Sequence, residues 1–168
     1  MAATLETRIA LEIQLALLEG VDLGTRKFEP VIKRLKNLGS GAGLDQASQL
    51  FTDTRSLAGS ATEDLDFASG GGLVDQFGVA IAFTKLKLLY VSCALANLNN
   101  LEVVSGAAGI RFLKASGDAI IMHPDSYICL VWPTAGGITV TPTTADLITF
   151  TNAAPTNTIS YDVVAVGA

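Results

Sequence analysis

The chain has 168 residues, of which 49% are hydrophobic, and a formal net charge of −5 at pH 7. This length suits a single domain that buries a core without disulfides or a structural metal ion. No uninterrupted apolar run reaches the ~18 to 20 residues that a membrane-spanning helix needs, so we expect no membrane partner.

Charge and apolar content vary along the chain. Six of its 11 Lys and Arg residues lie within residues 1–38, and none follows Lys114. The last third therefore cannot neutralise phosphates, and we expect no nucleic-acid partner. Its weakly charged, Thr-rich and Ala-rich composition is typical of a surface packed against neighbouring subunits. No basic region followed by an apolar segment opens the chain, which predicts synthesis in the cytoplasm without a secretory signal.

Residues 8–18 form the first predicted element, and two secondary structures fit them. Apolar side chains occupy every second position from residue 9 to residue 17, which favours a strand. The same residues are good helix formers, and Leu5, Ile9, Ile13 and Ala16 would line one face of a helix. Such a helix would be apolar nearly all round, so we favour the strand and keep the helix as an alternative.

Residues 20–43 contain several breaks. Gly20, Asp22 and Gly24 interrupt the first pattern, and Pro30 argues against a central strand over residues 28–38. The glycine-rich run 39–43 lacks the spacing of a nucleotide-binding loop and indicates a flexible turn. We therefore divide the chain into an N-terminal extension, residues 1–43, which is an arm or a set of first strands, and a body, residues 44–168.

Strand patterns follow one another regularly in the body. Turns containing Gly, Pro or Asn separate them at intervals of about 8 to 12 residues, which is typical of a β-sandwich or jelly roll. We predict an all-β fold of two packed antiparallel sheets. The predicted strands are 62–67, 79–84, 86–90, 101–104, 110–113, 119–122, 126–132, 138–141, 146–151 and 158–166. In 79–84 the small residues at positions 80, 82 and 84 would form a face that another sheet or subunit can approach.

Few residues suit catalysis or metal binding. His123 is the only histidine, it precedes a proline in a turn, and neither cysteine lies at metal-ligand spacing from it. No Gly-x-Ser-x-Gly motif nominates a nucleophile. Cys129 falls in a predicted strand and Cys93 in a strand-like continuation of residues 86–90, and both are expected to be buried, reduced thiols. We therefore expect no catalytic residue, no cofactor and no metal ion.

The densest acidic group is Glu63, Asp64 and Asp66. These residues alternate with Leu65 and Phe67, which predicts a strand whose acidic face lies in solvent. Calcium binding by this group is the alternative.

Nine side chains are candidates for contacts with another protein. The basic residues of the extension could lie against an acidic surface, and Asp53 and Arg55 could form ion pairs at an interface. Trp132 and Tyr161 could anchor a partner, although such residues more often lie in the core, which is the place we favour for them. The nine candidates are Arg8, Arg26, Lys27, Lys33, Arg34, Asp53, Arg55, Trp132 and Tyr161.

Several segments of the body resemble small structural proteins encoded by tailed bacteriophages. These segments are Phe51–Ala58, Ala61–Asp66, Gly78–Thr84, Asn97–Asn100, Gly117 to Pro124, Asp146–Asn152 and Tyr161–Gly167. The resemblance covers residues 44–168 and implies a virion structural protein rather than an enzyme. Among such proteins, a small, acidic, β-rich chain is most similar to the capsid decoration, or cement, class.

The resemblance also implies partners and a location. Decoration proteins commonly sit as trimers on the head lattice and bridge neighbouring capsomers. We therefore expect the major capsid protein of the same virus and other copies of this chain as partners, in a homo-oligomer, preferably a trimer. We expect the capsid surface of the virion as the location, after synthesis in the host cytoplasm.

Two other functions remain open from the sequence. The chain could be a tail, neck or fibre component that contacts other virion proteins or a host glycan. It could also be an enzyme or ligand-binding domain with a cupin-like metal site inside a jelly roll. The single histidine makes the last interpretation the weakest.

Overall fold

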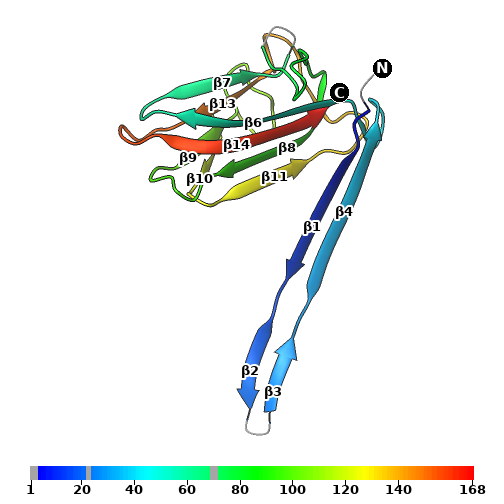
Figure 1. Cartoon of the computed structure of the whole chain (residues 1–168), viewed down its shortest axis with the longest axis vertical. Coiled ribbons are helices and arrows are strands. Elements are labelled where there is room, and N and C mark those ends of the chain that lie inside the picture. The colour runs from blue at the N-terminus through cyan, green and yellow to red at the C-terminus, as the bar shows by residue number, and fades with distance from the viewer. Residues whose placement is uncertain (1–3, 22–23, 69–71) are drawn as a thin grey trace.

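The computed structural model describes residues 4–21, 24–68 and 72–168, and all the regular elements of these residues are strands (Figure 1). The prediction of an all-β fold is confirmed. A sandwich-like body of two sheets carries a long hairpin arm, and the hairpin projects from one end of the body.

The larger sheet of the body has five strands. Their order is β11-β8-β14-β6, and β12 extends the pairing along β8. Every pairing in this sheet is antiparallel. The strands are β6 (Gln49–Leu57), β8 (Lys85–Cys93), β11 (Tyr127–Val131), β12 (Ile138–Thr139) and β14 (Ile159–Gly167).

The smaller sheet has four antiparallel strands in the order β10-β9-β13-β7. They are β7 (Thr62–Asp66), β9 (Leu101–Val104), β10 (Ala119–Met122) and β13 (Leu147–Thr151). Alternate side chains of both sheets form one core, as the period of two in their sequences requires. In β13, for example, Ile148 and Phe150 are fully buried while their neighbours are half-buried.

Four strands build the arm: β1 (Thr7–Gln14), β2 (Leu17–Val21), β3 (Gly24–Phe28) and β4 (Val31–Ser40). β1 pairs with β4 and β2 pairs with β3, both antiparallel. Between the two ladders the amide of Leu15 donates to the carbonyl of Pro30 at 3.1 Å. Pro30 has no N–H to return, so the ladder is interrupted there. The strand favoured for residues 8–18 is therefore confirmed, with residues 15 and 16 between its two parts.

Two predicted strands are wrong. Residues 79–84 form only an isolated bridge between Ala80 and Val74, after a turn in which the Asp75 carboxylate accepts from the amides of Phe77 and Val79. Val79 is 60% exposed whereas Ile81 and Phe83 are buried, so residues 80–84 keep the expected alternation of small, more exposed residues and buried apolar ones without forming a strand. Residues 110–113 form a loop that buries Ile110. The amide of Ile110 donates to the carbonyl of Leu147, the first residue of β13. Alternating apolar residues also occur in loops that fold onto a core.

Candidate binding surface

The arm carries a large exposed apolar surface. Nine large apolar side chains among its described residues are 40% to 70% exposed: Leu11, Ile13, Leu15, Leu17, Leu18, Phe28, Val31, Ile32 and Leu35. Full burial of one such side chain is worth about 1.5–3 kcal/mol, so covering this half-exposed set would contribute on the order of 10 kcal/mol. These side chains are divided between the two faces of the ribbon, and exposed apolar surface on this scale is typical of sites where proteins bind one another. The arm is therefore a candidate surface for binding another protein.

The half of the arm next to the body, β1 paired with β4, is its root half. The register of this pair gives it two unlike faces. Ile9, Leu11 and Ile13 lie opposite Lys36, Arg34 and Ile32, so this face combines an apolar column on β1 with two basic side chains on β4. The other face is more polar.

On that polar face Lys33 lies 3.1 Å from Glu12, and the amide of Gln14 donates to the same carboxylate at 2.7 Å. These two contacts, with Gln14 the larger, lower the pKa of Glu12. The residues are exposed, so this pair fixes side-chain direction more than stability.

A groove of about 950 Å³ opens between the root of the arm and the outer face of the five-stranded sheet. The sheet supplies an apolar floor made of Leu50, Leu88, Tyr90, Val131, Val164 and Val166. Ile9 and Leu11 of the arm form the opposing wall.

Cys129 lines the same groove and is exposed, which corrects the prediction that both cysteines are buried; Cys93 is buried in the core. Partial desolvation raises the pKa of Cys129, so its thiol form is favoured at neutral pH.

The root of the arm is attached to the body by specific bonds. Leu38 of β4 is buried with Ala47, Leu88 and Val166, and β4 pairs with the short parallel strand β5 (Gln46–Ala47). This two-residue parallel pairing departs from the predicted antiparallel pattern.

Lys87, which the sequence analysis did not single out, is fully buried beneath the turn that follows the arm. Its Nζ donates to the carbonyls of Gly43 and, at 3.4 Å, of Ala42. Burial lowers the pKa of Lys87, and Lys85 adds to this effect while Asp45 opposes it. Lys36 of the arm meets Asp45 at 2.5 Å. The direction of the arm is thus fixed at its base.

The five predicted basic contact residues all lie on the arm and are exposed: Arg8, Arg26, Lys27, Lys33 and Arg34. Lys27 pairs with Glu29 at 2.5 Å. Residues 1–43 contain six basic and five acidic side chains, whereas residues 44–168 contain five basic and eleven acidic ones. The arm and the body therefore carry net charges of opposite sign.

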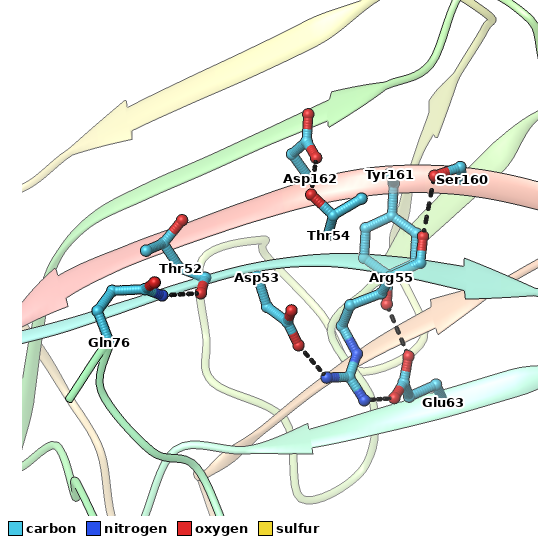
Figure 2. Close-up of polar contacts among 9 residues, drawn as sticks. All are labelled: Thr52, Asp53, Thr54, Arg55, Glu63, Gln76, Ser160, Tyr161 and Asp162. Carbon is cyan, nitrogen blue, oxygen red and sulfur yellow. Dashed lines mark hydrogen bonds and ion pairs between the residues drawn. The ribbon is translucent and has the colours of Figure 1, made fainter. Parts of the chain in front are cut away.

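Asp53, Arg55 and Tyr161 come together elsewhere, at one edge of the sandwich (Figure 2). The Arg55 guanidinium on β6 donates to Asp53 at 2.6 Å and to Glu63 on β7, and the Tyr161 hydroxyl donates to Glu63 at 2.9 Å. β6 and β7 are edge strands of different sheets, so this cluster links the two sheets.

The electrostatics of this cluster follow from its geometry. The hydrogen bond from Arg55 lowers the pKa of Glu63 despite partial burial, and Glu63 raises that of Arg55 in turn. Burial, reinforced by Glu63, raises the pKa of Tyr161 far above its ordinary value.

One sequence-based interpretation changes as a result. Glu63 was expected on a solvent face, but it lies on the same side of β7 as buried Leu65. Tyr161 is 1% exposed and stacks on Phe150 with ring centroids 4.7 Å apart, so it is a core residue that no partner reaches. Trp132 is half-buried against the core, and its amide donates to the carbonyl of Lys87 at 2.8 Å.

His123 lies exposed in a turn, where its carbonyl accepts from Ser126. Among the described residues no group of three or more His, Cys, Asp or Glu side chains is arranged to hold a metal ion. Nor does any helix long and apolar enough to cross a membrane occur in this part of the chain. No protein-family model, curated protein or solved structure matches the chain.

Proposed function

We propose that this chain is a structural protein of a tailed-bacteriophage virion, a capsid decoration protein that self-associates and stabilises the head lattice. The observation that carries the proposal is the arm, a hairpin with nine exposed large apolar side chains. Exposed apolar surface on this scale is typical of sites that bind another protein. The resemblance of residues 44–168 to phage structural proteins is the reason for proposing a virion as the location.

The mechanism follows from mass action. A protein that binds the assembled lattice and not its free subunits raises the free energy needed for disassembly. The arm would supply the contact, with apolar side chains for affinity and basic side chains such as Arg8 and Arg34 to orient it on an acidic surface. The sandwich body would act as the rigid base that holds the arm.

Quantitative mass spectrometry of purified particles tests the proposal. We expect a copy number near that of the major shell protein. A few copies per hundred shell proteins would instead assign the chain to the tail, neck or fibre, and absence from particles would overturn a virion role.

Rebinding to empty shells tests the role of the arm. A chain lacking residues 1–43 should lose binding, whereas the full-length variant Leu98→Ser, which changes an exposed apolar residue of the body, should bind normally. Unchanged binding without the arm would contradict the proposed contact.

A further inference from the structure

We propose that strand β4 in the arm of one copy pairs with strand β7 in the body of a second copy, edge to edge and antiparallel. This inference rests on the proposed function, because it names the contact through which copies of the chain associate. β4 is one of the two strands of the arm, and β7 is one edge of the four-stranded sheet. The arm of one copy then extends the sheet of its neighbour.

The outer edge of β4 offers unpaired backbone groups. The amide of Leu15 donates to the carbonyl of Pro30, and this pair continues the β1–β4 register, so alternate residues such as Arg34 are the ones that bond to β1. The N–H and C=O groups of Lys33 and Leu35 therefore point away from β1. On that side β4 pairs with β5 only at its last two residues. A hairpin of two strands is marginally stable in water and gains from a third strand.

β7 offers a matching edge. The amide of Phe67 donates to the carbonyl of Asp146 at 2.8 Å, and this pair continues the β7–β13 register. Alternate residues counted back from Phe67, such as Leu65, therefore bond to β13. The backbone groups of Thr62 and Asp64 point to the free edge instead, and both residues are exposed. A further strand can therefore add to this side of the sheet.

The two edges carry opposite charge. β4 contains three basic side chains and no acidic one, whereas β7 contains three acidic side chains and no basic one. The six residues are Lys33, Arg34, Lys36, Glu63, Asp64 and Asp66. The other edge strands of the body, β6, β10 and β11, carry no net charge. Because like charges keep two β4 edges apart, β7 is the edge of the body that complements β4.

Contacts within one copy leave most of these charges available. Among the described residues, the carboxylates of Asp64 and Asp66 accept from neutral donors, a threonine hydroxyl at 2.5 Å and a backbone amide at 2.8 Å. Arg34 forms no ion pair with a described residue, and the pair of Lys33 with Glu12 is exposed and therefore weak. The remaining two, one on each strand, are held in ion pairs within the copy.

One antiparallel register satisfies backbone and charge together. With Lys33 opposite Asp64, the two residues exchange their outward N–H and C=O groups, and their side chains lie on the same face. The same register sets Ile32 opposite Leu65. Ile32 is 48% exposed in the free arm, and it then lies beside a buried apolar residue of the core.

The β4 and β7 edges of one chain do not meet. Leu38, Lys87 and the Lys36–Asp45 pair fix the root of the arm, and the arm points away from the edge of the body that β7 forms (Figure 1). The partner edge therefore belongs to another copy. A contact between two unlike edges is head-to-tail, so it closes into a ring or continues as a chain of copies.

Sedimentation of the purified full-length chain over a range of concentrations is the first test. We expect reversible association that Asp64→Lys weakens at least about tenfold, because it sets a like charge opposite Lys33. Lys33→Glu should weaken association similarly, and the two changes together should restore it. The matched control is Glu102→Lys, which makes the same change of charge on β9, a strand paired on both sides, and should leave association unchanged.

Amide hydrogen exchange locates the contact. The outward amides of Leu35 and Asp64 should exchange more slowly as the protein associates. The amide of Ala10, which points outward from the opposite edge of the arm, should keep its rate. Protection of the Ile9 and Leu11 amides, which bond to β4, reports in every variant that the arm is intact.

Four results would overturn the inference. They are a wild-type chain that stays monomeric, association that survives either single charge reversal, association without slower exchange at the two outward amides, and a double variant with an intact arm that does not associate. Because these experiments use the chain alone, their failure leaves the virion proposal standing, and absence from virions would leave their result standing.

Discussion

At the scale of single residues, Glu63 connects the two sheets through contacts that depend on pH. Arg55 lowers its pKa in the fold below the ordinary value of about 4.3, so the contribution of Glu63 to stability is present above that value and is lost as pH falls through the folded pKa. Glu63→Gln should lower the free energy of unfolding by about 1–3 kcal/mol at neutral pH. It should also reduce the further loss of stability as the pH falls into the acid range. Urea unfolding between pH 3 and 7 measures this, with Glu102→Gln as control; parallel curves for E63Q and wild type would contradict it.

Tyr161 predicts a loss of stability at high pH instead of low pH. Burial and Glu63 raise its pKa in the fold, so its contribution is complete below the unfolded value of about 10 and is lost as pH rises above it. Tyr161→Phe should cost about 1 kcal/mol at pH 8 and reduce the loss of stability between pH 9 and 11. Tyr127→Phe, at an exposed tyrosine, is the control in the same unfolding series. An unchanged basic limb in Y161F would mean that Tyr161 titrates as it does in water.

At the scale of elements, the turn between β6 and β7 fits only a glycine. A Cβ at Gly59 would lie 2.5 Å from the carbonyl oxygen of Pro155, and backbone cannot move aside as a flexible side chain can. Gly59→Ala should lower the free energy of unfolding by about 1–3 kcal/mol. Gly136→Ala, whose Cβ would meet open space, should change it little. Equal stability of the two variants would show that the turn relaxes.

The junction of arm and body makes a separate prediction. Lys87→Met keeps the length of the side chain but removes the donor to Gly43 and Ala42. We expect faster amide hydrogen exchange over residues 39–47 with little change in β13, because the loss is local. A uniform change in exchange across the body would show that Lys87 supports the whole core instead.

Some elements could be predicted from sequence and others could not. Residues 101–104 and 119–122 were predicted with the bounds that the structure has, because alternation and turn residues agree there. The hairpin was ambiguous because its apolar residues suit a helix as well, and because Pro30 argued against a strand over residues 28–38. The contacts among Arg55, Glu63 and Tyr161 could not be foreseen, because they require knowing that Tyr161 pairs with Arg55 across more than 100 residues.

At the scale of the whole molecule, the arm and the body should be energetically separable. None of the described residues in the tip half of the arm belongs to either buried cluster. Joining Gln14 to Val31 through an Asn-Gly turn in place of residues 15–30 should therefore leave the free energy of unfolding of the body within about 0.5 kcal/mol of wild type. Chemical denaturation followed by Trp132 fluorescence measures it. A large loss would mean that the tip contacts the body.

The interrupted ladder at Pro30 has a mechanical consequence. A two-stranded ribbon that lacks one backbone hydrogen bond bends more easily at that point than along its continuous ladders. The arm therefore consists of two continuous ladders, β1 with β4 and β2 with β3, and one position between them where it bends more easily. A bend at that position changes the angle of the tip without disturbing the groove or the body. The apolar side chains of the tip can therefore reach a bound protein that lies at somewhat different distances from the body.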